Sequence, residues 1–284
     1  MSMQHTKFAE CEVAFRAATR VGSLMCFGAG LLLLWACAHV PTQRETEGAL
    51  AHYDLGIYVQ QTNPQAALYE FNQALALNPR LTEAVHAKAV LFHLAFRRPG
   101  EAEALYREAL RQKPGYSEAK VNFGNLLAEQ GRHAEAVALY EEALNDLMYP
   151  TPYLARANLG WAYFQAGNAG LAQANLRQAI AQNPSFCLAY FMLSSVYKTQ
   201  GNLLAACEQL EMFAMHCPEH ADAHRQHGTC LQELQKLKEA AQAFKDCISK
   251  ATATEEMLRR SCQRSLEALL KMSTETEAFI SIGE

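Results

Sequence analysis

Apolar and small residues recur from about residue 48 onward with the spacing of amphipathic helices, and the pattern repeats along the chain. Two stretches, Asn122–Leu144 ("NFGNLLAEQGRHAEAVALYEEAL") and Asn158–Pro184, align with each other. Small residues recur at matched places, where two helices must approach closely: Gly124 with Gly160, Gly131 with Gly167, Ala136 with Ala172, and Ala143 with Ala179. The pattern predicts an all-α chain built from repeated helix pairs.

Six such units can be read in phase, and together they span most of the chain. Their expected bounds are approximately 48–80, 81–115, 116–151, 152–185, 186–219 and 220–252. The linker between the third and fourth units ("LMYPTPY") is longer than the others. Residues 253–272 predict a cap helix that solvates the end of the array, and residues 273–284 predict a loose tail.

The landmarks of these units resemble those of the tetratricopeptide repeat, a helix–turn–helix unit of about 34 residues. The first unit has Leu55-Gly56, Ala67, Phe71, Ala74 and Pro79 at the landmark positions. This resemblance implies a right-handed superhelical solenoid, in which the first helix of every pair lines a concave groove. The expected fold is therefore about six tetratricopeptide helix pairs plus a C-terminal cap helix.

The resemblance also indicates which side chains face the groove. When the groove positions of the family are assigned to this sequence one by one, the groove is apolar and aromatic through its middle and polar in the sixth unit. The side chains expected to bind a partner are Tyr53, Ile57, Leu91, Val121, Asn125, Asn158, Trp161, Phe164 and Phe191. Exposed aromatic side chains suit a partner segment laid in the groove. The alternative is that they pack on one another or on the N-terminal tether.

Two of these residues, Asn125 and Asn158, lie on successive units. A side-chain amide both donates and accepts, so it can pair with the backbone of an extended peptide. Related repeat domains that bind peptide C-termini also use a lysine where this chain has Val121. That difference favours an internal segment over a terminal carboxylate. Alternatively, the two asparagines only cap or solvate the inner face.

The N-terminal part contains one membrane-like run, Val21–Val40, without Asp, Glu, Lys or Arg. Basic residues precede it, as in a secretory signal peptide. The sequence Leu34-Trp35-Ala36-Cys37 resembles the site at which a lipoprotein signal peptidase cleaves. We therefore expect a signal peptide over 1–36, a lipid on Cys37 and a tether over 37–47. An uncleaved transmembrane anchor is the alternative.

Six cysteines lie in the C-terminal half of the chain. Repeat positions place Cys187 near Cys217, Cys207 near Cys230, and Cys247 near Cys262, so three disulfides are possible in an oxidising compartment. Six buried, unpaired thiols are the alternative. A histidine-rich stretch, His216–Cys230, has some helical metal-ligand spacings but no closed four-ligand pattern. We therefore expect no metal.

The composition and the motifs exclude two classes of function, nucleic-acid binding and catalysis. The net charge of -4 provides no basic field for nucleic acid. The sequence has no phosphate-binding loop, nucleophile elbow or paired carboxylates. We therefore expect a non-enzyme with no cofactor other than the covalent lipid.

A lipidated cysteine, a short tether and six repeats together resemble the pilotins, the lipoproteins of type IV pilus biogenesis. The most telling stretch is "YEEALNDLMYPTPYLARANLGWAYFQAGN" (140–168). The resemblance implies a scaffold in the outer membrane, facing the periplasm, that binds the secretin subunit and helps it assemble. The alternatives are a periplasmic adaptor for peptidoglycan enzymes or outer-membrane assembly, and a metal- or redox-responsive regulatory subunit.

Overall fold

The computed structural model describes the backbone of residues 40–282 and the side chains of residues 40–271. The expected signal peptide and Cys37 lie outside these residues. The first helices of the pairs are α3 (Gln43–Val59), α5 (Thr82–Leu94), α7 (Ser117–Glu129), α9 (Pro152–Gln165), α11 (Cys187–Thr199) and α13 (Ala221–Glu233). The second helices are α4 (Pro64–Leu77), α6 (Pro99–Gln112), α8 (His133–Leu144), α10 (Ala169–Gln182), α12 (Leu203–His216) and α14 (Leu237–Lys250). This all-helical solenoid confirms the expected fold class.

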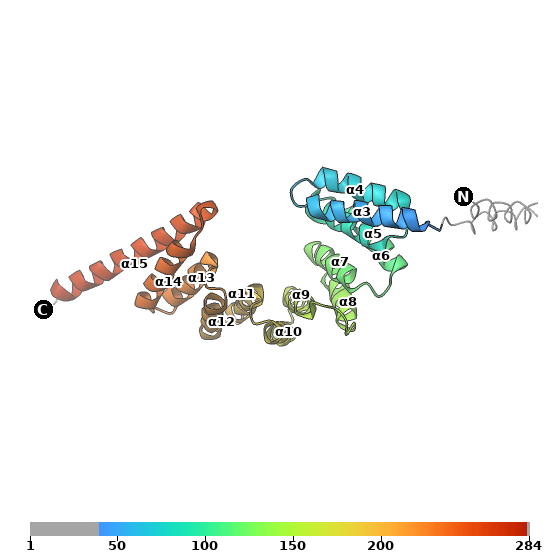
Figure 1. The fold of residues 1–284 in the computed structure, drawn as a ribbon. Coiled ribbons are helices and arrows are strands. Elements are labelled where there is room, and N and C mark those ends of the chain that lie inside the picture. The colour runs from blue at the N-terminus through green and yellow to red at the C-terminus, as the bar shows by residue number, and fades with distance from the viewer. Residues whose placement is uncertain (1–39, 283–284) are drawn as a thin grey trace, which may run out of the picture.

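The pairs follow one another along an open arch, with α7, α9 and α11 on its inner side and α8, α10 and α12 on its outer side (Figure 1). First helices of neighbouring units touch directly, as α7 touches α9 and α9 touches α11. Among the described residues, no two second helices of neighbouring units touch each other. The inner side of the arch is therefore a closely packed row of first helices, on which a groove can form.

Four of the six helix pairs contain a glycine that faces a large buried side chain of the second helix. A Cβ atom added to Gly56 would lie 2.4 Å from the Phe71 ring, and one added to Gly124 would lie 2.6 Å from the Tyr140 ring. Both rings are almost fully buried. Only glycine leaves room for the ring of the second helix at this distance, because any other residue would displace it.

The turns inside the pairs require a left-handed backbone. Gly131, Gly167 and Gly201 have φ values of 77°, 81° and 74°, and glycine adopts this conformation without steric cost. The second and sixth units place Arg97 (φ 54°) and Gln235 (φ 60°) there instead. These two turns carry a local strain that the glycine turns avoid.

Both ends of the array differ from the expected bounds. The side chain and backbone of Thr42 form a capping box with Glu45, so α3 begins at Gln43, inside the stretch expected to be a tether. At the other end, a 3₁₀ turn, η1 (Ala253–Glu255), leads into α15 (Glu256–Ile282). The helical backbone thus runs through the expected tail, which has no proline and no glycine before Gly283. No described helix is both long and apolar enough to cross a bilayer.

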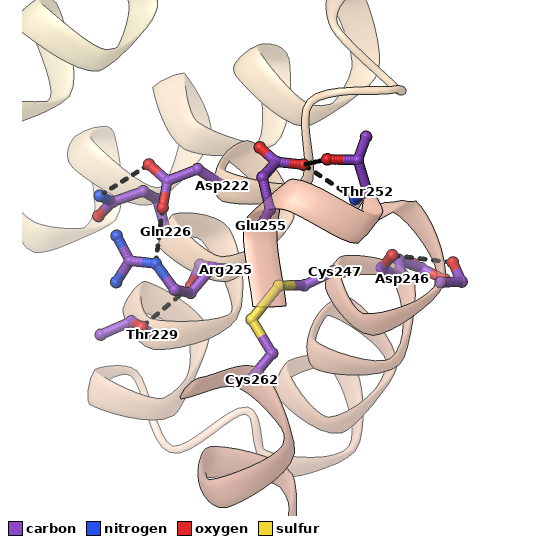
Figure 2. Close-up of a disulfide and its surroundings, with 10 residues drawn as sticks. Asp222, Arg225, Gln226, Thr229, Asp246, Cys247, Thr252, Glu255 and Cys262 are labelled. Carbon is purple, nitrogen blue, oxygen red and sulfur yellow. Dashed lines mark hydrogen bonds and ion pairs between the residues drawn. A yellow bond between two sulfur atoms is a disulfide. The ribbon is translucent and has the colours of Figure 1, made fainter. Parts of the chain in front are cut away.

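Three disulfides join the C-terminal helices. They are Cys187–Cys217, Cys207–Cys230 and Cys247–Cys262, with Cα–Cα distances of 6.1, 5.5 and 6.3 Å. The first closes the fifth unit, the second links α12 to α13, and the third links α14 to α15 (Figure 2). In the N-terminal half of the described chain, the units are held by packing, hydrogen bonds and ion pairs alone.

We expect the substitution Gly124→Val to lower the free energy of unfolding by about 2–3 kcal/mol, because the added atoms collide with the buried Tyr140 ring. Urea denaturation followed by circular dichroism would measure the change. Gly100→Ala is the matched control, since no atom lies within 4 Å of its added Cβ. A Gly124→Val protein as stable as the control would contradict the packing argument.

We expect reduction of the disulfides to loosen only the C-terminal half of the array. The chain-entropy model assigns about 3–4 kcal/mol to each of these cross-links, whose cysteines are 30, 23 and 15 residues apart. Amide hydrogen exchange after reduction should therefore accelerate in α11–α15 and remain unchanged in α3–α8. Equal acceleration in both halves would show that the cross-links do not act locally.

Candidate functional site

The aromatic residues expected in the middle of the groove come together in the structure. Trp161 and Phe164 lie on α9 with ring centroids 5.0 Å apart, and Phe191 lies on α11. All three are partly exposed and pack against one apolar cluster that spans α9–α13. The three aromatic side chains are therefore partly exposed over the same apolar cluster on two neighbouring first helices.

The other expected groove residues divide into two groups. Tyr53 is partly buried and Ile57 is 37% exposed on α3, so both remain accessible. Leu91 and Val121, by contrast, are only 3% and 5% exposed. Leu91 packs against Phe71, and Val121 belongs to the core around Tyr106. The expectation that these two side chains line the groove is wrong, because neighbouring helices cover them.

A cleft of about 410 Å³ opens between α7, α8 and α9. Its lining residues are Asn125, Ala128, Glu129, His133, Tyr140, Asn158, Trp161, Ala162 and Gln165. The volume lies in the lower part of the range for ligand pockets, roughly 300–1,000 Å³. Polar side chains from two successive units thus surround one cleft, with the indole of Trp161 beside them.

The two asparagines in this cleft are hydrogen-bonded to each other. The Tyr140 hydroxyl donates to Asn125 Oδ1 at 2.7 Å, and Asn158 Nδ2 donates to the same oxygen at 2.9 Å. Among the described residues, Asn125 Nδ2 and Asn158 Oδ1 have no partner. The cleft therefore presents one fixed donor and one fixed acceptor, the pair that a peptide backbone requires.

Glu129 is the only acidic residue that lines the cleft, and the lining includes no Lys or Arg. The imidazole of His93 holds it, with Nε2 3.1 Å from the Glu129 carboxylate, while the Tyr106 hydroxyl lies 3.4 Å from Nδ1 of the same ring. Burial raises the pKa of Tyr140, and the negative charge of Glu129 raises it further. The Glu129 carboxylate therefore acts on the same hydroxyl that orients Asn125.

Sequence analysis missed Glu129, His133, Tyr140 and Gln165 as cleft residues. Two of them have a simple signal: Glu129 follows Asn125 by one helical turn, and Gln165 follows Trp161 by one turn, so each shares a face with an expected residue. His133 begins α8, where its buried Nδ1 atom has no hydrogen-bond partner. Its place beside α7 depends on how the turn folds, which no sequence pattern revealed.

The histidine- and cysteine-rich stretch is occupied by structural contacts. Cys217 and Cys230 are in disulfides. The His216 ring stacks on Tyr190 with centroids 5.4 Å apart, and His224 Nε2 lies 2.9 Å from the Pro218 carbonyl oxygen. In the part of the chain that the structure describes, no three His, Cys, Asp or Glu side chains could hold one metal ion.

A second accessible feature is the turn between α8 and α9. Leu147 and Met148 are 96% and 87% exposed there. Asp146 fixes the turn, because its carboxylate accepts hydrogen bonds from Ser117 Oγ and from the Met148 amide. The next residue, Tyr149, is buried in the core. Two large apolar side chains are thus held in solvent by an ordered turn, away from the cleft residues.

Comparison with known proteins finds resemblances in sequence and in fold. The chain is 29% identical to the type IV pilus assembly protein PilF of Pseudomonas aeruginosa over 168 residues, which are 58% of this chain and 65% of PilF. The match thus spans slightly less than two thirds of that relative. A tetratricopeptide-containing thioredoxin of Arabidopsis thaliana is 31% identical over 120 residues, but these are only 16% of its length.

Two solved structures have the same fold over most of the chain. The crystal structure of PilW, described as a widely conserved type IV pilus biogenesis factor, has a TM-score of 0.64 and 24% identity, covering 71% of this chain and 92% of PilW. The structure of Pseudomonas aeruginosa PilF has a TM-score of 0.64 and 21% identity, covering 78% of this chain and all of that one. At these identities the likeness concerns the fold.

Family models for the tetratricopeptide repeat match residues 57–115, 93–148 and 157–212. The matched residues make up just over half of the chain and include the α7, α8 and α9 segments that form the cleft. Together with the six helix pairs, these matches show that the chain belongs to the tetratricopeptide repeat family.

Proposed function

We propose that this chain is a non-enzymatic scaffold of type IV pilus biogenesis that holds a segment of a partner protein in its groove. The observation that carries the proposal is the aromatic and amide-lined inner surface of α7, α9 and α11. The resemblance to the pilus assembly protein PilF spans the same kind of repeats. Such a surface binds by shape and hydrogen bonding and needs no catalytic group.

The partner that we propose is the secretin subunit of the pilus machinery. The pilotin resemblance supports this choice, and the role would be to bring the subunit to the outer membrane and promote its assembly into multimers. The fixed amides of Asn125 and Asn158 suit the backbone of an extended segment. Pilus formation and twitching motility would then depend on this contact.

The proposed location is the periplasmic face of the outer membrane, with a lipid on Cys37. The three disulfides support an oxidising compartment outside the cytoplasm. Only five residues separate Cys37 from the start of α3 at Gln43. They can span at most about 20 Å, so a lipid there would keep the first repeat close to the membrane surface.

We expect the double substitution Trp161→Ala with Phe191→Ala to weaken binding of the purified secretin subunit at least tenfold. Both rings are partly exposed over the apolar cluster of α9–α13, and central aromatic residues dominate binding energy at interfaces. Calorimetric titration would measure the affinity, and circular dichroism would check the fold. The control is Leu147→Ser with Met148→Ser, which changes exposed apolar residues outside the groove.

The two variants distinguish the two faces of the solenoid. Loss of binding in the groove variant alone supports the proposal. Loss in the turn variant alone would move the contact to the turn between α8 and α9, and would contradict the groove proposal. If both variants fold and bind the secretin subunit as tightly as wild type, neither surface is the binding site.

Deletion of the gene should remove the heat-stable secretin multimer from outer-membrane fractions while monomer persists. Wild type should restore the multimer, and Cys37→Ala should restore less, because the protein would lose its lipid anchor. Gel electrophoresis without full denaturation would measure the multimer. Normal multimers in the deletion strain would exclude the pilotin role and indicate another client, as for a periplasmic adaptor.

A further inference from the structure

The cleft between α7, α8 and α9 presents hydrogen-bond acceptors from two successive units. Glu129 contributes a carboxylate that is about half exposed. Asn158 contributes its Oδ1 atom, because its Nδ2 atom is already donated to Asn125. Gln165 adds a further amide at the rim, one turn beyond Trp161. A ligand group that satisfies this set must carry several donors.

The acceptors are held in place before any ligand arrives. His93 Nε2 lies 3.1 Å from the Glu129 carboxylate, and the Tyr106 hydroxyl lies 3.4 Å from Nδ1 of the same ring, so the buried imidazole holds the carboxylate in place. The Tyr140 hydroxyl and Asn158 fix the orientation of Asn125. Binding therefore requires little rearrangement, which favours affinity.

The charges around the cleft exclude an anionic ligand. The nearest lysine along α7, Lys120, pairs with Glu142 at 3.0 Å and is not among the lining residues. Arg132 pairs with Glu103 and Glu135. No described Lys or Arg lines the cleft, so a carboxylate or phosphate there would lie near the charge of Glu129 with no lysine or arginine to bind it.

One wall of the cleft is the indole of Trp161, whose other neighbour is the Phe164 ring. Tryptophan is the best aromatic partner for a cation that lies over its face. A planar guanidinium can stack on such a ring and also donate in several directions within its plane. Ammonium is a point charge with no plane to stack, so it matches this wall less well.

We propose that the cleft receives an arginine side chain of the bound segment, with the guanidinium donating to Glu129 and Asn158 and lying against Trp161. This inference rests on the proposed function, because it assigns the chemistry of the segment held in the groove. The backbone of that segment would pair with Asn125 Nδ2 at the cleft mouth. The cleft would thereby prefer partner segments that carry an arginine away from their chain ends.

The test uses the mature chain from Cys37 onward, in which Trp161 is the only tryptophan and thus the only indole fluorophore. The probes are blocked pentapeptides, acetyl-Gly-Ala-X-Ala-Gly-amide, in which X is arginine, citrulline, lysine or glutamate. Citrulline has nearly the shape of arginine without its charge. Titration followed by Trp161 fluorescence, with calorimetry as a second readout, would give each affinity.

We expect the arginine peptide to bind at least tenfold more tightly than the citrulline, lysine and glutamate peptides. Glu129→Gln should abolish this preference, although glutamine can still accept from His93. Glu142→Gln removes the same charge from α8, outside the cleft, and should leave the preference intact. Added salt should reduce the arginine preference, because it screens a partly exposed charge.

Several results would overturn the inference. Equal binding of arginine and citrulline, equal binding of arginine and lysine, or a preference that survives Glu129→Gln would each do so. If secretin binding depends on Trp161 and Phe191 but the arginine peptide does not bind, this inference is wrong and the proposed groove function still stands. Loss of that dependence would instead overturn the proposed groove function.

Discussion

The close approach of two helices within each unit is the constraint on which the rest of the structure depends. Gly56, Gly124, Gly160 and Gly228 leave the space that Phe71, Tyr140, Leu176 and Phe244 occupy. Because the paired helices are so close, each pair packs against the next pair as one rigid unit. In the stacked units, first helices of neighbouring pairs contact each other and second helices do not. This difference bends the array into an arch. The groove is a consequence of that bend.

The features that repeat were predictable from the sequence, and the features that depend on one particular neighbour were not. The small residues and landmarks that recur in phase predicted the helix pairs and their number, since similar local packing recurs along the chain. Leu91 and Val121 occupy positions that face a groove in the family, yet here neighbouring helices bury them. Helix ends were also misplaced, because the Thr42 capping box starts α3 before the repeat pattern begins.

The candidate site was predicted in part for the same reason. Asn125, Asn158 and Trp161 occupy periodic positions and do line one cleft. Glu129 and His133 border the turn between α7 and α8, where repeat periodicity ends. Their contribution depends on the hydrogen bond from His93 and on the register of α7 against α8. The helical spacing places Glu129 on the same face as Asn125, but it does not reveal the contact with His93, which lies on another unit.

The cleft also lies where the two kinds of internal support meet. From the fifth unit onward, disulfides cross-link the helices. Before it, neighbouring units are joined by packed cores, hydrogen bonds and ion pairs such as Lys113 with Glu83 and Arg132 with Glu103. Exposed or half-exposed ion pairs of this kind contribute at most about 1 kcal/mol each. The N-terminal units can therefore adjust more readily than the C-terminal units.

Tyr140 connects this packing to the cleft. Its ring fills the space above Gly124, so it belongs to the interaction that holds the third unit together. Its hydroxyl donates to Asn125, so it also sets the direction in which that amide faces a ligand. The ligand-facing groups are thus oriented by the same contact that folds the repeat. A binding surface that is fixed in advance loses less entropy when a partner binds.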